Sequence, residues 1–229
     1  MSDDLYKKYI FPSHQVAVDI INSEKKLPIG KVLCVGRNYK KHIKEMGEST
    51  KEEPFFFSKP AQSISQKKNI IFPKDTKNLQ YEVELVVFIG KRCFEIHPND
   101  AVNYIYGFSV GIDLTKRDLQ KIAKENRRPW AFSKGFEDSA PISLVNTNIK
   151  IPTTAKIKLF QNGELKQSGD LSEMIWSVDE IISKISKKII LYPGDVIFTG
   201  TPSGVGSILP GDKISALIDE VGNLEIFFN

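Results

Sequence analysis

Two glutamates stand two positions apart in an otherwise apolar segment, residues 81–89. Side chains i and i+2 of a β-strand point to the same face, so a strand here would project Glu82 and Glu84 together. Two buried carboxylates repel each other and each loses its hydration, and a bound divalent cation would offset both costs. The alternative is a solvent-facing stripe on an amphipathic strand.

A third acid, Asp113, ends the apolar run 106–112. A strand end at this point would deliver its carboxylate to the cavity that holds the two glutamates, whereas a helix start would give it a capping role. Three oxygen ligands with room left for water or substrate favour Mg²⁺ or Mn²⁺ over zinc. If the acids converge, they therefore predict a site for a hard divalent cation.

Two further features suit acid–base and oxyanion chemistry. His42 and Glu45 lie three residues apart in a stretch with a helical pattern, and so on one face, where a carboxylate can orient an imidazole that activates water. Lys134 is a charge within the aromatic, apolar run 130–136, a setting suited to holding a developing oxyanion. The alternatives are a surface His–Glu pair and a surface lysine whose stem covers apolar side chains.

The segment 199–206 is rich in glycine and follows an apolar strand. It lacks the lysine–serine or lysine–threonine pair of a phosphate-binding loop and does not complete a dinucleotide-binding fingerprint. Its glycines allow the backbone to approach a ligand closely, with the Thr201 hydroxyl and amide N–H groups as donors. A plain hairpin connection is the alternative.

Short strands must position these groups, because apolar runs bounded by turn residues outnumber helical stretches. Regular alternation of strands and helices is missing, which disfavours a doubly wound parallel sheet. We therefore expect an α+β fold that is mainly β, a mixed sandwich or roll with peripheral helices. The expected helices cover residues 39–46, 115–126 and 172–186, and the expected strands cover residues 31–36, 54–59, 69–72, 81–90, 104–113, 156–161, 189–200, 213–218 and 224–228.

The composition is that of an ordinary globular protein, with 41% hydrophobic and 26% charged residues. The net charge of +4 is spread along the chain, which disfavours nucleic acid as a partner and suits a small anionic substrate. Cys34 and Cys93 lack the spacing of a zinc site or a disulfide framework, and no apolar run reaches membrane-spanning length. We expect a soluble, cytoplasmic protein with an N-terminal arm or small hairpin, residues 1–30, before a main domain of residues 31–229.

Six motifs occur in the order GRNYKKH, PFFFSKP, YEVELVVFIG, GIDLTKRDLQ, PWAFSKGF and GDVIFTGTPSGVG. Together they resemble the fumarylacetoacetate hydrolase family, most closely its acylpyruvase branch, over roughly residues 31–228. The resemblance implies a homodimer with one Mg²⁺ or Mn²⁺ per subunit, bound by Glu82, Glu84 and Asp113. It implies that His42 with Glu45 forms a water-activating dyad. It further implies that the substrate is faced by Arg37, Arg117, Gln120, Lys134 and Thr201.

The same resemblance implies a small 2-oxo acid substrate whose 1-carboxylate and 2-oxo group bind the metal. His42 would activate water for attack on the distal carbonyl of an acylpyruvate, and Lys134 or a neighbouring donor would hold the oxyanion while the C–C bond breaks and pyruvate leaves. Oxaloacetate at this site would lose CO₂ or isomerise between keto and enol forms, so an oxaloacetate decarboxylase or isomerase is the alternative. A non-catalytic, metal-dependent dicarboxylate-binding protein is the alternative of another class.

Overall fold

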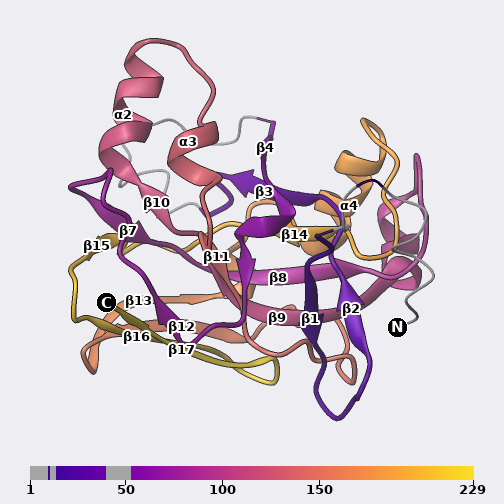
Figure 1. Ribbon diagram of the computed structural model, residues 1–229. Coiled ribbons are helices and arrows are strands. Elements are labelled where there is room, and N and C mark those ends of the chain that lie inside the picture. The colour runs from indigo at the N-terminus through magenta and orange to yellow at the C-terminus, as the bar shows by residue number, and fades with distance from the viewer. Residues whose placement is uncertain (1–9, 11–13, 40–52) are drawn as a thin grey trace.

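The computed structural model describes residues 10, 14–39 and 53–229. Most of the regular structure in these residues is β-strand, in two five-stranded sheets and three smaller ones (Figure 1). The two large sheets share one hydrophobic core. The expected α+β, mainly β fold is confirmed.

The first large sheet consists of β3 (Val32–Gly36), β4 (Phe55–Lys59), β8 (Val83–Ile89), β9 (Ile105–Ile112) and β14 (Val196–Phe198). Its order is β4-β3-β14-β8-β9, with β3 and β14 parallel and the other pairs antiparallel. Strand β8 is buried along its whole length, because both of its faces are covered. Leu85 and Val87 enter the core shared with the second sheet, whereas Val86 and Phe88 enter a smaller core on the opposite face.

The second large sheet consists of β6 (Asn69–Ile70), β12 (Lys156–Gln161), β13 (Glu164–Asp170), β16 (Lys213–Ile218) and β17 (Gly222–Phe228). Its order is β13-β12-β16-β17-β6. Every second residue of β16 is buried, as expected for a strand with one face on the core. Ile214 and Ala216 pack there with Leu85 of the first sheet.

Three small sheets complete the β-structure of the described residues. Strands β1 (Ala17–Asp19) and β2 (Lys26–Pro28) form a hairpin, β5 (Ile64–Ser65) pairs in parallel with β11 (Ala140–Pro141), and β7 (Leu79–Tyr81) lies between β10 (Thr115–Lys116) and β15 (Gly206–Ile208). The hairpin expected within residues 1–30 is thus present, while the division into an arm and a main domain stays a prediction.

The helices lie at the periphery of the sheets, and Figure 1 shows α2 and α3 side by side at one end of the molecule. In the described part of the chain, the α-helices are α2 (Arg117–Glu125), α3 (Ala131–Lys134) and α4 (Val178–Ser186), and the 3₁₀ helices are η2 (Ala61–Ser63), η3 (Pro98–Tyr104) and η4 (Leu171–Glu173). Helix α4 buries Ile181 and Ile185 in the large core. No helix among the described residues is long and apolar enough to cross a membrane.

Four predicted elements differ from the structure. The strand run 81–90 is broken at Glu82, which separates β7 from β8, and the run 189–200 is a strand only at β14. The helix predicted over residues 172–186 begins at Val178, because the Glu180 carboxylate accepts hydrogen bonds from the N–H and hydroxyl of Ser177 and fixes the start there. Tyr39 forms an isolated bridge with Met174 instead of starting a helix, and residues 40–46 of that predicted helix lie outside the described residues.

Candidate functional site

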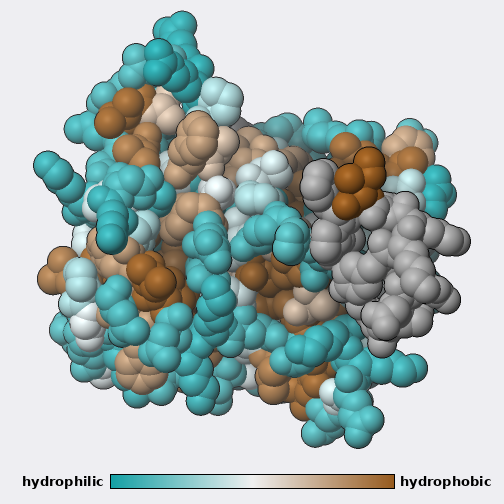
Figure 2. Space-filling view, viewed as in Figure 1, coloured by the Kyte–Doolittle hydropathy of each residue, from teal (hydrophilic) through white to brown (hydrophobic). Residues whose placement is uncertain are grey.

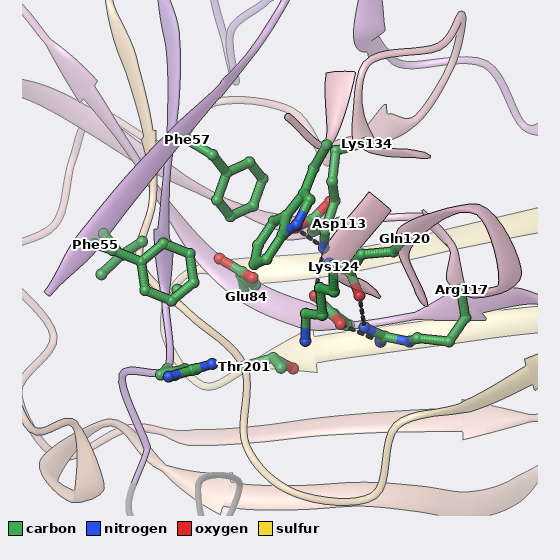
Figure 3. A pocket seen from close by; sticks show the side chains of 14 residues that line it. Phe55, Phe57, Glu84, Asp113, Arg117, Gln120, Lys124, Lys134 and Thr201 are labelled. Carbon is green, nitrogen blue, oxygen red and sulfur yellow. Dashed lines mark hydrogen bonds and ion pairs between the residues drawn. The ribbon is translucent and has the colours of Figure 1, made fainter. Parts of the chain in front are cut away.

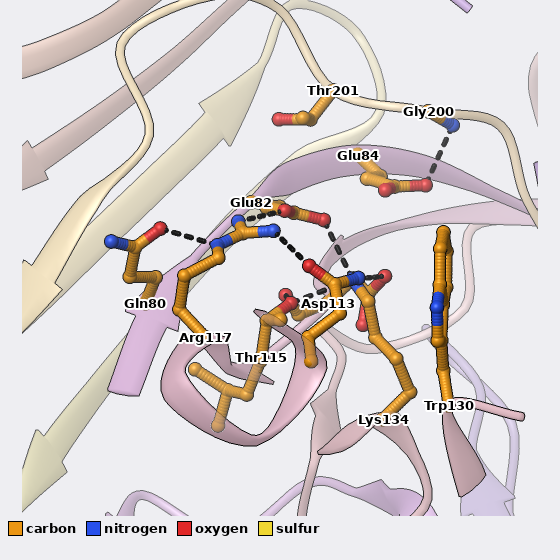
Figure 4. A network of polar contacts seen from close by, with 12 residues as sticks. Gln80, Glu82, Glu84, Asp113, Thr115, Arg117, Trp130, Lys134, Gly200 and Thr201 are labelled. Carbon is orange, nitrogen blue, oxygen red and sulfur yellow. Dashed lines mark hydrogen bonds and ion pairs between the residues drawn. The ribbon is translucent and has the colours of Figure 1, made fainter. Parts of the chain in front are cut away.

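Three buried carboxylates meet where β8 begins and β9 ends (Figure 4). One oxygen each of Glu82, Glu84 and Asp113 lies within 4.8 Å of the others. Glu84 is on β8, Glu82 occupies the break before it, and Asp113 directly follows β9. The hairpin register pairs Val83 with Ile112, and the N–H of Asp113 donates to the carbonyl of Glu82 at 2.8 Å. The antiparallel pairing therefore brings the three acids together, and Asp113 is not a helix cap.

The three acids fit a hard divalent cation. Burial raises the pKa of Glu84, and the neighbouring Asp113 and Glu82 carboxylates raise it further. The N–H of Gly200 donates to Glu84 Oε2 at 2.6 Å and offsets part of this cost. A cation among the three oxygens would stabilise all three acids in their charged form, and an all-carboxylate donor set suits Mg²⁺ or Mn²⁺.

Lys134 is buried and joins two of these acids, so the surface position considered for it is wrong. Its Nζ donates to Asp113 Oδ2 at 2.6 Å, to Thr115 Oγ1 at 2.6 Å and to Glu82 Oε2 at 2.8 Å. Burial acts to lower the pKa of Lys134, but the Asp113 and Glu82 charges outweigh it and raise that pKa. All three ammonium donors are engaged, so Lys134 would have to exchange one acceptor in order to bind an oxyanion.

A second buried lysine, which the sequence analysis missed, reaches Asp113 from β4. Lys59 Nζ lies 2.8 Å from Asp113 Oδ1, an ion contact without the angles of a regular hydrogen bond. The same ammonium donates to the carbonyls of Ser139, at 3.0 Å, and of Lys134. Asp113 therefore has one lysine at each oxygen. A sequence signal existed, because Lys59 ends the run FFFSK much as Lys134 ends the run AFSK.

Arg117 is fixed on the side of Glu82 by three acceptors. Its Nε donates to Gln80 Oε1 at 2.7 Å, its Nη1 donates to Gln120 Oε1 at 2.7 Å, and its Nη2 pairs with Glu82 Oε1. Helix α2 places Arg117 and Gln120 three residues apart, on one face. Gln80 lies on β7 and was not predicted. The guanidinium is therefore held in one plane beside the carboxylates.

Phe55, Phe57 and Trp130 form an aromatic wall of the cavity (Figure 3). The Trp130 ring centroid lies 5.3 Å from that of Phe55 and 5.7 Å from that of Phe57, both with edge-to-face geometry. Three cations lie over this wall. Arg37 Cζ is 5.4 Å from the Phe55 centroid, Lys124 Nζ is 5.3 Å from the Trp130 centroid, and Lys134 Nζ is 5.1 Å from the Phe57 centroid. The aromatic faces thus help to hold these cations at the cavity.

Arg37 adopts a left-handed backbone conformation, with φ of 62°. This conformation costs a non-glycine residue about 1–2 kcal/mol, so the surrounding contacts must stabilise it. The buried side chain of the next residue, Asn38, supplies such stabilising contacts. Its Nδ2 donates to the carbonyls of Thr199 at 2.7 Å and Trp176 at 2.9 Å, and its Oδ1 accepts from Trp176 N at 2.8 Å.

The glycine-rich segment forms the wall opposite α2 and is not a plain hairpin. Thr201 lines the cavity, and its hydroxyl accepts a hydrogen bond from Gln167 Nε2 at 2.9 Å. Gln167 Oε1 in turn accepts from Val83 N at 3.0 Å. Gly200 has φ of 97°, and a Cβ at this position would lie 2.7 Å from the Cβ of Asn38. The segment therefore passes close to the acids because glycine permits it.

One cavity gathers eight of the ten predicted site residues. These are Arg37, Glu82, Glu84, Asp113, Arg117, Gln120, Lys134 and Thr201. The other two, His42 and Glu45, lie outside the described residues. The roles assigned to all ten stay predictions. The sequence analysis missed Phe55, Phe57, Lys124 and Trp130, which also line the cavity.

The comparisons with known proteins agree on one family. The family model described as "Fumarylacetoacetate (FAA) hydrolase C-terminal" matches residues 31–227. The chain is 42% identical to the mitochondrial oxaloacetate tautomerase FAHD1 of Homo sapiens over 81% of this chain and 85% of that protein. It is 40% identical to the mitochondrial oxaloacetate decarboxylase of Dictyostelium discoideum, over 80% of this chain and 86% of that protein. The crystal structure of fumarylpyruvate hydrolase from Pseudomonas aeruginosa in complex with Mn²⁺ and pyruvate is 39% identical, with a TM-score of 0.93 over 96% of this chain and 98% of that chain.

Proposed function

Because the chain belongs to the fumarylacetoacetate hydrolase family, we propose that it is a divalent-metal-dependent hydrolase that cleaves a C–C bond in acylpyruvates and releases pyruvate. The convergence of Glu82, Glu84 and Asp113 in a cavity bordered by fixed cations carries this proposal. The similarity to a fumarylpyruvate hydrolase that was crystallised with Mn²⁺ and pyruvate supports it.

We propose that Glu82, Glu84 and Asp113 bind one Mg²⁺ or Mn²⁺ per subunit. Such a cation, when bound, supplies Lewis acidity to the 2-oxo group of the substrate. Lys59 and Lys134 keep Asp113 oriented through its two oxygens. Arg117 does the same for Glu82.

The side chains around the acids would orient the substrate. We assign this role to Arg37, Arg117, Gln120 and Thr201, whose donors border the cavity. For water activation we propose His42 supported by Glu45, both outside the described residues. The imidazole would take a proton from water as the water oxygen bonds to carbon 4. The bond between carbons 3 and 4 then breaks, and carbon 3 takes a proton to give pyruvate.

A tautomerase or decarboxylase acting on oxaloacetate is the second candidate, and one observation favours it. The three donors of Lys134 are already engaged by Glu82, Asp113 and Thr115. Isomerisation and decarboxylation need no oxyanion at carbon 4, whereas hydrolysis does. Relatives at 40–42% identity are named oxaloacetate tautomerase and oxaloacetate decarboxylase.

The test is pyruvate release from acetylpyruvate and, separately, from oxaloacetate, with EDTA-stripped protein before and after addition of Mg²⁺ or Mn²⁺. The enol-to-keto conversion of oxaloacetate is followed by its ultraviolet absorbance. Metal-dependent cleavage of acetylpyruvate as the fastest reaction supports the hydrolase. If the conversion of oxaloacetate is faster than the cleavage of acetylpyruvate, the protein is the tautomerase or decarboxylase and not the hydrolase. If the protein binds the metal tightly but turns over neither compound, it is a dicarboxylate-binding protein.

We also propose a cytoplasmic homodimer with the catalytic domain in residues 31–229 and an N-terminal arm in residues 1–30. Cys34 and Cys93 are buried free thiols, which is compatible with a reducing compartment. The relatives from Homo sapiens and Dictyostelium discoideum have names that place them in mitochondria. Light scattering after size-exclusion chromatography tests the dimer, and microscopy of the fluorescently tagged protein tests the location.

A further inference from the structure

A buried glutamine that takes no part in the proposed mechanism links two walls of the cavity. Gln167 lies on β13 and is 0% exposed. Its Oε1 accepts a hydrogen bond from Val83 N at 3.0 Å, and its Nε2 donates to Thr201 Oγ1 at 2.9 Å and to the carbonyl of Pro202 at 2.8 Å. Val83 stands between two of the three acids, and Thr201 and Pro202 belong to the glycine-rich segment. One amide therefore joins the acid-bearing strand to that segment.

The partners of Gln167 allow only one orientation of its amide. A backbone N–H only donates and a carbonyl only accepts, so Oε1 must face Val83 and Nε2 must face Pro202. The reversed amide would place its NH₂ group against the Val83 N–H and its oxygen against the Pro202 carbonyl. Both of these buried groups would then lose their partner. Nε2 therefore also faces Thr201, and the Thr201 hydroxyl has to accept from it.

This arrangement determines where the Thr201 hydroxyl can donate. A hydroxyl has one hydrogen and two lone pairs, and the oxygen that accepts from Nε2 has to direct its hydrogen elsewhere. Among the described residues, this hydroxyl makes no other hydrogen bond. Thr201 is 3% exposed and lines the cavity, on the segment that Figure 4 shows beside the carboxylates. The hydrogen is thus available to a ligand in the cavity.

We propose that Gln167 is a positioning residue, which holds the Thr201 hydroxyl as a donor toward an anionic oxygen of the bound 2-oxo acid. Without the Nε2 donor, the hydroxyl could turn and present a lone pair, which would repel a carboxylate. The amide sets the donor before the ligand binds, which lowers the cost of ordering the site. This inference rests on the proposed function in placing a 2-oxo acid beside the three carboxylates.

Gln167→Glu reverses the polarity of this contact with almost no change in shape. The carboxyl group can still accept from Val83 N, but it has no N–H for Thr201, so the hydroxyl turns and donates to it. The test is oxalate binding to the Mg²⁺-loaded protein, measured by calorimetry, because oxalate has the anionic oxygens of a 2-oxo acid and is not cleaved.

Gln167→Glu is made alone, together with Thr201→Val, which lacks the hydroxyl at nearly the same shape, and together with Thr201→Ser, which keeps it. The three backgrounds form a double-mutant cycle and its conservative counterpart. Ser168→Glu is the control, because it adds the same charge at the next residue of β13, which is exposed. Thermal unfolding without oxalate records any loss of stability separately.

We expect Gln167→Glu and Thr201→Val each to weaken oxalate binding about tenfold, as the loss of a hydrogen bond to a charged group does. With Thr201→Val already present, Gln167→Glu should weaken binding by no more than about twofold further. With Thr201→Ser it should keep its full effect. Ser168→Glu should leave the affinity unchanged.

Equal weakening by Gln167→Glu with and without the hydroxyl would show that the residue acts through the fold or through charge, and this result overturns the inference. Unchanged oxalate affinity in Gln167→Glu, or no oxalate binding by the unaltered protein, overturns it as well. If Gln167→Glu does not fold, Gln167→Met enters the same cycle, because it also removes the donor, and the same dependence on the hydroxyl is expected. Failure of the proposed function appears elsewhere, as no turnover of acetylpyruvate or oxaloacetate while the coupling in oxalate binding persists.

Discussion

Lys59 and Asp113 form an ion pair of 2.8 Å between side chains that are 0% and 1% exposed. Each charge has given up its hydration, so the pair is held by mutual attraction and by the hydrogen bonds around it. The ammonium also donates to carbonyl groups of Leu114, Lys134 and Ser139. Lys59 thus links β4 to the backbone segment that follows β9, at Leu114, and to the backbone of Lys134 and Ser139.

Lys59→Met should lower the free energy of unfolding by about 3 kcal/mol, because it leaves a buried charge and several carbonyl groups without their partner. Urea titration followed by tryptophan fluorescence measures this change. Lys67→Met is the control, since Lys67 is 58% exposed and pairs with Asp138 at the surface; its effect should stay below about 1 kcal/mol. Equal effects of the two variants would contradict the prediction.

Glu84→Gln should weaken Mn²⁺ binding by on the order of 100-fold or more, beyond the range seen for changes outside the ligand shell. The same variant should be at least as stable as the unaltered protein without added cation, because burial and two neighbouring carboxylates disfavour the Glu84 charge. Calorimetry gives the affinity and thermal unfolding gives the stability. Glu164→Gln, at a side chain that is 75% exposed, is the control and should change neither quantity. Unchanged Mn²⁺ binding in Glu84→Gln would remove it from the ligand set.

The part of the site that strand geometry determines is predictable from the sequence. Residues two apart on a strand share a face, so the spacing groups Glu82 with Glu84, and a strand end offers Asp113 as a third acid; the resemblance to a family was needed to join all three in one ligand set. The buried core strands are predictable for the same reason, because their apolar runs are long and bounded by turns. The break at Glu82 interrupts that pattern, and the run 189–200 forms a strand only at Val196–Phe198.

Residues that join the site through tertiary packing are not predictable in this way. Gln80 and Gln167 are ordinary polar residues of strands, and only the pairing of distant segments brings their amides to Arg117 and Thr201. The sequence leaves Lys134 as either an oxyanion donor or a surface residue, because periodicity does not reveal which acceptors surround a buried ammonium. Its engagement with Glu82 and two other acceptors is a property of the folded chain.

Asp170 should contribute stability that depends on pH. Its hydrogen bond with Lys156, followed by those from Ser172, lowers its pKa from 3.8 to about 2. A lowered pKa means that the contribution is complete above about pH 3.8 and is lost as the pH falls through about 2. Asp170→Ala should therefore cost about 1 kcal/mol at pH 7, through loss of the cap on η4, and the difference should narrow in acid. Urea unfolding at pH 7, 4 and 2.5 measures it, and a difference that stays constant down to pH 2.5 would refute the assignment.

Gly200→Ala should impair both stability and metal binding, whereas Gly211→Ala should impair stability alone. Both glycines have positive φ, 97° and 92°, so each alanine carries about 1–2 kcal/mol of backbone strain. A Cβ at Gly211 would meet nothing within 4 Å, but one at Gly200 would lie 2.7 Å from the Cβ of Asn38.

The overlap at Gly200 must push the glycine-rich segment away from Asn38, and with it the N–H that donates to Glu84 Oε2 at 2.6 Å. We therefore expect Gly200→Ala to lose about 1–3 kcal/mol more than Gly211→Ala, as overpacking does in other interiors, and to bind Mn²⁺ about tenfold or more weakly. Urea unfolding and calorimetry on the two variants separate the two effects. Equal Mn²⁺ affinity in both would show that the Gly200 N–H does not help to position Glu84.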